Sequence, residues 1–260
     1  MLTPDTIPNL QVKNNKLRSY LLPDDCAYRY ETLLEDKKNV NSCIQYLIQF
    51  GVYSEEMAAK ANLIAQLLHE PCFDTLRTKE QLGYVVFSSV ANTHGTTNLR
   101  ILVQSERSSA YLESRIVAFL NSFGRTLEEM PEDVFEKHKS SLIKSLEQKL
   151  TNLRQEHERF TTAIYLADYN FCAKQRRADI ISNFSKNDMV EFYKNFVLSP
   201  HSPRLVIHLK SQVENNRPED AVEGYPTGSL ITSIDEFKSN LCLAPVRQAV
   251  KNFEVAHPKL

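Results

Sequence analysis

Hydrophobic and polar residues alternate or cluster in short runs near the N-terminus, as they do in β-strands. Strands are predicted over residues 17–22, 28–34 and 42–52, which are separated by turns rich in Pro, Asp, Lys and Asn. Because the connections are short, these three strands are expected to pair antiparallel, as a meander. Similar runs at 84–90 and 99–103, on either side of a polar turn, predict a second hairpin.

Between the two sets of strands the hydrophobic period changes to that of a helix. Met57, Ala61, Ile64 and Leu68 recur at helical spacing and define one apolar face. This helix is expected to pack on the core through that face. It is predicted to end at Pro71, because proline lacks the backbone donor that a helix interior requires.

The second half of the chain carries further helical patterns. Helices are predicted to begin at Ser108 or Ser109 and at Pro131, and to cover residues 154–168 and 185–196. Each has apolar residues at a spacing that places them on a single face. These helices are therefore expected to cover a common core.

A last strand is predicted over residues 204–209. Its alternation points Leu205, Ile207 and Leu209 to one side of the sheet and His208 to the other. Strands followed by helices and a closing strand are typical of an α+β fold. We expect an antiparallel sheet packed on one side by several helices.

The whole chain, 1–260, is predicted to form a single α+β domain. Three regions are expected within it: a polar N-terminal segment, a core, and a loop with a C-terminal extension (1–16, 17–211 and 212–260). In the last region, the charged segment 212–229 is expected to loop over the surface. Residues 237–250 are apolar enough to dock on the core.

Composition indicates a globular protein and argues against some functions. A chain of 260 residues with 42% hydrophobic residues can bury a sizeable core. Its 31 basic and 32 acidic side chains nearly cancel, which argues against a nucleic-acid partner. No apolar run approaches the roughly twenty residues of a membrane helix, so no membrane span is expected.

Cysteine use and the termini bear on the compartment. The cysteines are odd in number, lack a C-x-x-C pair and are expected to be free thiols: Cys26, Cys43, Cys72, Cys172 and Cys242. The polar N-terminus lacks the features of a secretory signal, so the cytoplasm is the expected compartment. The final Pro258-Lys259-Leu260 departs by its proline from a peroxisomal signal, which leaves that destination as the weaker alternative.

No metal site is predicted in this chain. A zinc peptidase helix needs two histidines one turn apart, and none of the seven histidines has such a partner. His69 and His157 each precede a glutamate, but neither has a second histidine at the required spacing. Each histidine is therefore expected to lie on the surface or to cap a helix.

Possible chemistry concentrates in the residues that follow Pro71. Arg77 and Tyr84 are two donors that can polarise a peptide carbonyl if they converge. A structural role is the alternative, with Arg77 paired to Glu80 along a helix and Tyr84 packed. Cys72 near His69 suggests a thiol nucleophile, although a buried structural cysteine is favoured.

The same stretch resembles a known family. EPCFDTLRTKEQLGYVVFSS (residues 70–89) is similar to the C-terminal half of the insulin-degrading enzyme and pitrilysin (inverzincin) metallopeptidases, in particular the fungal a-factor pheromone-processing proteases. The similarity continues through QSERSSAYLESR (104–115), FEKHK (135–139), DMVEFYK (188–194) and FKSNL (237–241). It spans essentially the whole chain and implies the last of four homologous α+β domains.

The resemblance implies a division of labour between domains. In the family, the first domain holds zinc through an H-x-x-E-H motif, which this chain lacks. The last domain supplies an arginine and a tyrosine that reach the substrate, which match Arg77 and Tyr84 as catalytic residues. Phe73 and Val86 match positions that line the substrate pocket.

The implied activity belongs to a larger protein. The resemblance implies that the N-terminal half of the same protease is the partner that cuts the peptide. It also implies peptide substrates and a homodimer. This chain is expected to hold no cofactor and to be inactive alone. The alternative is a catalytically inert scaffolding or binding module of the same fold.

Overall fold

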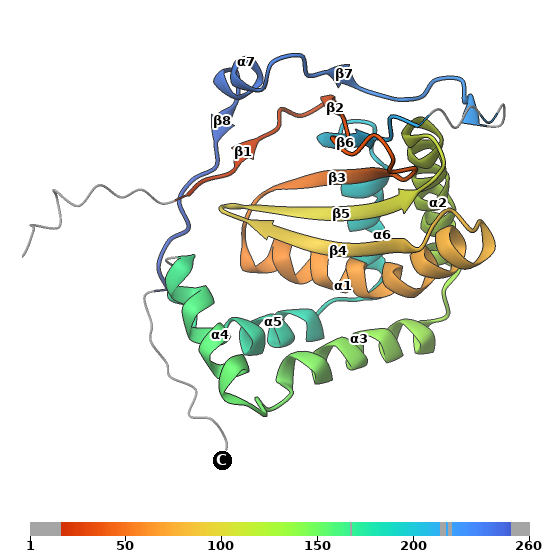
Figure 1. The fold of residues 1–260 in the computed structure, drawn as a ribbon. Coiled ribbons are helices and arrows are strands. Elements are labelled where there is room, and N and C mark those ends of the chain that lie inside the picture. The colour runs from red at the N-terminus through yellow and green to blue at the C-terminus, as the bar shows by residue number, and fades with distance from the viewer. Residues whose placement is uncertain (1–16, 167, 214–216, 218–219, 251–260) are drawn as a thin grey trace, which may run out of the picture.

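A six-stranded sheet forms the centre of the fold (Figure 1). The computed structural model describes residues 17–166, 168–213, 217 and 220–250. In order across the sheet, the strands are β4 (Val85–Thr93), β5 (Thr96–Ser105), β3 (Ser42–Val52), β6 (Arg204–Lys210), β2 (Ala27–Leu33) and β7 (Ser229–Leu230). Neighbours pair antiparallel except around β2, which runs parallel to both β6 and β7.

The meander predicted for the first three strands is wrong. β6 lies between β2 and β3, and the first predicted strand shortens to β1 (Tyr20–Leu21), which pairs with β8 (Cys242–Leu243) outside the main sheet. β3 is a central strand and needs a partner on each side. One partner is β5 and the other is β6, an apolar strand that is distant in the sequence. The predicted hairpin is confirmed as β4 and β5.

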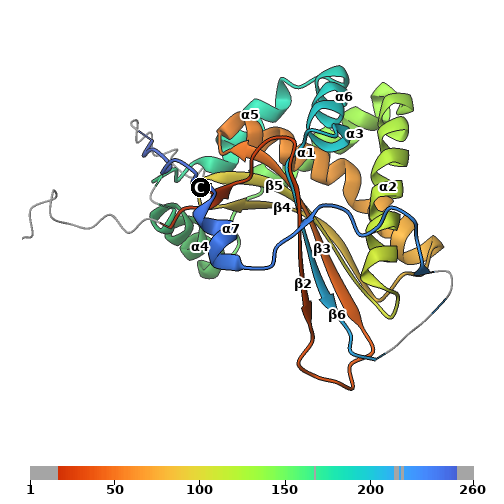
Figure 2. The ribbon, with the colours of Figure 1, turned by 90° about the horizontal axis from the view of Figure 1, so that it is seen from above.

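The helices of the described chain are α1 (Glu55–Cys72), η1 (Phe73–Lys79), α2 (Ser109–Glu129), α3 (Glu132–Glu147), α4 (Leu153–Tyr165), α5 (Ala173–Ser182), α6 (Lys186–Tyr193), η2 (Lys194–Leu198) and α7 (Ile234–Ser239). Most of them gather on one face of the sheet, whereas α7 lies beside the other face, where its Phe237 ring contacts Tyr28 of β2 (Figure 2). α1 and α2 lie against the sheet, while α3 and α5 pack on α1. The predicted α+β class, with helices on one side of a mostly antiparallel sheet, is confirmed.

The core lies between the sheet and these helices. Alternate residues of β3 and β5 point into it, and they meet the apolar stripes of α1 and α2. The largest fully buried side chains include Ile44, Ile48, Leu63, Ile64, Leu68, Phe123 and Tyr193. Ser108 begins α2, since its side chain accepts a hydrogen bond from the backbone N–H of Tyr111 at 3.2 Å.

Two helix predictions need correction. α1 does not end at Pro71 but includes it and continues into η1, a π-helix with wider turns. Pro71 removes one donor only, while the fully buried Cys72 and Leu76 hold the segment against the core. α5 was not predicted, because its polar sequence contains only two buried apolar residues, Ala178 and Ile181.

The prediction that every histidine lies on the surface or caps a helix is wrong for His208. This side chain is fully buried, and its Nε2 lies 3.0 Å from a carboxylate oxygen of Glu113, which is also fully buried. The alternation of β6 set His208 opposite Leu205, Ile207 and Leu209 but did not indicate which side is the core, and in the structure His208 and Val206 are the buried residues. Its partner on α2 is remote in sequence, so no local pattern indicated the contact.

Glu113 also anchors the C-terminal part of the chain. Its other carboxylate oxygen accepts hydrogen bonds from the backbone N–H of Thr227, at 3.0 Å, and from the Thr227 hydroxyl. Arg29 donates to the carbonyl oxygens of Pro226 and Thr227, at 2.9 and 3.3 Å. Part of the segment predicted to loop over the surface is therefore bonded to the interior. We call Glu113, His208 and Thr227 the buried cluster.

Candidate functional site

The predicted catalytic residues lie where η1 leads into β4. Phe73 and Arg77 are about one turn apart on η1, and Tyr84 directly precedes β4. The guanidinium carbon of Arg77 lies 4.7 Å from the ring centroid of Phe73 and 4.8 Å from that of Tyr84. The structure therefore brings these three residues together, through cation–π contacts. We call them the arginine cluster.

The arginine cluster is open to its surroundings. Tyr84 is 83% exposed and Phe73 is 39% exposed, which is unusual for large aromatic residues. Arg77 is half-buried. Within the described part of the chain, neither the Arg77 guanidinium nor the Tyr84 hydroxyl has a hydrogen-bond or ion-pair partner. Their donors are free to bind an acceptor from outside.

The structural alternative for Arg77 and Tyr84 is wrong in both parts. Glu80 does not pair with Arg77; its two carboxylate oxygens accept hydrogen bonds from Nε and Nη2 of Arg115, each at 2.7 Å. Tyr84 is not packed. This partner was missed from the sequence because Arg115 lies on α2, remote in sequence from Glu80.

The loop from Glu80 to Tyr84 is tightly built. Leu82 is 3% exposed, and its backbone N–H donates to the carbonyl of Leu76 at 3.0 Å. Gly83 passes so close to β5 that a Cβ would lie 1.9 Å from the backbone oxygen of Gln104. No other residue type fits there without a backbone shift. The loop thus determines where Tyr84 stands relative to Arg77.

Val86 is more deeply buried than the other predicted site residues. Its side chain is 5% exposed and belongs to the hydrophobic core, on the helix-covered side of β4. It therefore presents almost no surface to a ligand in this structure. Its role in substrate binding stays a prediction of the family resemblance.

Cys72 is poorly suited to act as a nucleophile. The side chain is fully buried, and burial raises the pKa of its thiol to about 12. At neutral pH almost none of this cysteine is thiolate, the form that reacts. His69, its suggested base, lies on the exposed side of α1.

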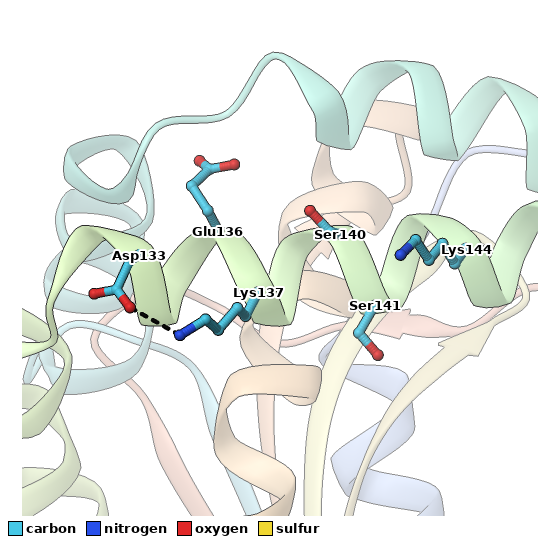
Figure 3. Close-up of a pocket in the computed structure, with 6 residues that line it drawn as sticks. All are labelled: Asp133, Glu136, Lys137, Ser140, Ser141 and Lys144. Carbon is cyan, nitrogen blue, oxygen red and sulfur yellow. Dashed lines mark hydrogen bonds and ion pairs between the residues drawn. The ribbon is translucent and has the colours of Figure 1, made fainter.

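A depression on α3 is a weaker candidate for a functional site. A shallow depression along α3 is lined by Asp133, Glu136, Lys137, Ser140, Ser141 and Lys144 (Figure 3). All six side chains come from a single helix, and Asp133 and Lys137 pair with each other at 2.9 Å. No second element contributes a group to it, so it lacks the converging residues of a binding site.

The described residues contain no cluster of potential metal ligands. Across the residues that the structure describes, no three His, Cys, Asp or Glu side chains come close enough together to bind a metal ion. In the same part of the chain, every helix is too short or too polar to span a bilayer.

Three comparisons relate the chain to known proteins. Residues 63–161 match the family described as PQQ synthase PqqF-like, C-terminal lobe domain 4. The chain is 55% identical to the A-factor-processing enzyme of Saccharomyces cerevisiae, over 99% of this chain and 25% of that protein. It is 31% identical to the insulin-degrading enzyme of Homo sapiens, over 96% of this chain and 26% of that protein.

The fold has a solved counterpart. The crystal structure of pitrilysin aligns with a TM-score of 0.75 and 17% identity, over 89% of this chain and 24% of that one. The likeness at this identity concerns the fold alone. The chain spans about a quarter of the length of each of these relatives.

Proposed function

Because the chain is homologous to the C-terminal part of the zinc peptidase family that includes insulin-degrading enzyme, we propose that it forms the substrate-side half of a peptidase active site. The zinc belongs to another part of the same polypeptide, since this sequence lacks an H-x-x-E-H motif. When bound there, zinc polarises the scissile carbonyl and activates the attacking water. This chain supplies hydrogen-bond donors to the same substrate.

The free donors of Arg77 and Tyr84 carry the proposal. A peptide carbonyl oxygen gains negative charge as a nucleophile adds to its carbon, and fixed donors stabilise that charge. The Arg77 guanidinium is positively charged at any physiological pH, and the phenolic hydroxyl of Tyr84 can donate a hydrogen bond. Because neither group has a partner inside the described chain, neither must break an internal bond to reach the substrate.

Phe73 is proposed to contact a substrate side chain beside the scissile bond. It is exposed and adjoins the Arg77 guanidinium, so an apolar side chain placed on its ring also shields the site from water. Val86, from the core below, is proposed only to support this surface. The two aromatic rings also limit the rotamers of Arg77, which reduces the entropy lost when substrate binds.

The parent protein, and not this chain alone, is proposed to be the enzyme. Its partners are the N-terminal half of the same polypeptide and peptide substrates, and the chain by itself is expected to be inactive. Similarity to an A-factor-processing enzyme extends the proposal to maturation of a peptide pheromone. A cytoplasmic location and homodimer formation remain parts of this proposal.

The test uses the full-length protein and compares the variants Arg77→Ala and Tyr84→Phe with the wild type. Each variant removes one donor from the developing charge, so kcat should fall about 100- to 1000-fold for Arg77→Ala and about 100-fold for the milder Tyr84→Phe. KM should change little, because the donors act mainly in the transition state. Peptide turnover and zinc content are measured together.

Lys79→Ala is the matched control. Lys79 is a cation on the same π-helix, exposed and paired with Asp74 at 2.7 Å, and it does not contact the arginine cluster. Its loss should leave kcat unchanged. Full activity in both the Arg77 and Tyr84 variants would favour the alternative, an inert scaffolding module.

A further inference from the structure

The bidentate pair of Glu80 and Arg115 stands directly beside the arginine cluster. Glu80 ends η1 and opens the loop that carries Tyr84. Arg115 projects from α2, between turns whose Leu112 and Ile116 side chains are fully buried. The pair therefore ties one end of the loop to a helix that the core holds in place.

The Glu80–Arg115 pair has the bidentate geometry that makes an ion pair strong. Both carboxylate oxygens of Glu80 accept hydrogen bonds from Arg115 at 2.7 Å, as parallel bonds from a planar fork. The hydrogen bond with Glu80 raises the pKa of Arg115. The side chains are 20% and 36% exposed, so water screens the pair only in part.

Three independent contacts hold the loop, and the salt bridge is one of them. Leu82 is fixed by burial and by the hydrogen bond of its backbone N–H to the Leu76 carbonyl, and Gly83 is confined because β5 leaves no room for a side chain there. Gln81, between Glu80 and Leu82, has a φ of 52°, a left-handed conformation that residues other than glycine adopt only when their surroundings enforce it. An anchor on each side of Gln81 accounts for that conformation.

We propose that Glu80 and Arg115 are positioning residues of the peptidase site, which hold Tyr84 against Arg77. This inference rests on the proposed function. Tyr84 is almost wholly exposed and has no partner of its own, among the described residues, beyond the guanidinium of Arg77. Its place is therefore set by the loop, and the loop by Glu80 on one side and Gly83 on the other.

The first experiment measures kcat and KM of the full-length protein with Glu80→Gln, Arg115→Ala and Arg115→Lys. Breaking the pair lets Tyr84 move, and a misplacement of about 1 Å costs on the order of tenfold or more in kcat. Glu80→Gln and Arg115→Ala should each lower kcat about tenfold and leave KM within roughly twofold. Arg115→Lys should fall between them and the wild type, since lysine keeps the charge but loses the fork.

The second experiment separates positioning from stability. Glu80→Gln is repeated in a protein that already carries Arg77→Ala and Tyr84→Phe. If the pair acts through these two residues, its loss should then change kcat by less than about twofold, because coupled residues are not additive. A pair that serves only the fold would give lower thermal stability with unchanged kcat, or an equal loss in both backgrounds, and either result overturns the proposal.

The control is the exposed pair of Asp133 and Lys137 on α3. Asp133→Ala removes an ion pair of the same charge type far along the chain from the loop, and kcat should stay at the wild-type value. Failure of this inference is distinguishable from failure of the proposed function. If Arg77→Ala and Tyr84→Phe lower kcat while Glu80→Gln does not, the site stands and the positioning role falls.

Discussion

Two polar clusters in this molecule have opposite surroundings. In the buried cluster, Glu113 and His208 are fully buried, and the Glu113 carboxylate bonds to His208 on one oxygen and to Thr227 on the other. In the arginine cluster, Arg77 and Tyr84 carry donors without an acceptor in the described part of the chain. Among the described residues, the Glu113 carboxylate has partners on both oxygens, whereas the donors of the arginine cluster have none.

The difference separates groups that stabilise the fold from groups that await a ligand. A buried polar group without a partner costs free energy, so a fully buried carboxylate is expected to be bonded on both oxygens, as Glu113 is. An exposed donor keeps its bonds with water and can exchange them for a substrate at small cost. Both clusters contain an ionisable side chain, and burial decides which role it has.

The largest effect is expected from Glu113→Ala, which removes the acceptor at the centre of the buried cluster. His208 and the backbone N–H of Thr227 would both lose their partner, and the C-terminal segment would lose an anchor. The free energy of unfolding should fall by about 3–5 kcal/mol, the range for breaking a buried ionisable pair. Urea denaturation of the 260-residue chain measures it.

Glu129→Ala is the control, at an exposed position of the same helix. It should change stability by less than about 0.5 kcal/mol. A loss below about 1 kcal/mol for Glu113→Ala would show that the buried cluster is no more important to the fold than a surface residue, and the contrast would fail.

A smaller effect on stability, but one that reaches the arginine cluster, is expected from Gly83→Ala. The added Cβ would meet the Gln104 carbonyl oxygen at 1.9 Å, so the loop must shift away from β5. Stability should fall by about 1–3 kcal/mol. Peptide turnover by the full-length protein should fall as well, because the shift moves Tyr84.

Gly51→Ala is a matched comparison for that variant. Gly51 has a φ of 102° and open space around its missing side chain, so alanine there costs backbone strain of about 1–2 kcal/mol and no clash. Both glycine variants should lower stability, but only Gly83→Ala should lower turnover per folded molecule. Equal turnover in the two variants would show that the position of the loop does not affect the peptidase site.

Local patterns predicted much of the fold. β3 and the β4–β5 hairpin follow from the alternation of apolar residues, and the start of α2 follows from the capping serine at 108. The order of strands could not be predicted, because β6 joins the sheet through contacts with remote residues. The continuation of α1 past Pro71 depends on the burial of Cys72 and Leu76, which no helical period reveals.

The site was predictable in composition but not in detail. The residue types at 77 and 84 indicated two donors, the family resemblance added the apolar Phe73, and the structure brings the three together. Sequence proximity suggested a bond between Arg77 and Glu80, whereas Glu80 bonds to Arg115 on another helix. Long-range pairs of this kind leave no periodic signal, which is also why the partner of His208 was missed.

The smallest effect is expected at Cys72, which lies next to the arginine cluster in sequence but is buried. With a thiol pKa of about 12, it should resist iodoacetamide at about pH 8, whereas the exposed Cys242 should react. Alkylation of the native full-length protein should therefore leave peptide turnover unchanged, and chelation of zinc should abolish it. Mass spectrometry of the alkylated peptides identifies the modified thiols.

Because burial raises the pKa of Cys72, its reactivity should appear only as the pH approaches that value or as the chain unfolds. Loss of turnover in step with Cys72 labelling would instead favour a thiol hydrolase. That result would place the reactive group inside the core rather than at the exposed donors, and the contrast between the buried and the arginine cluster would no longer separate structure from function.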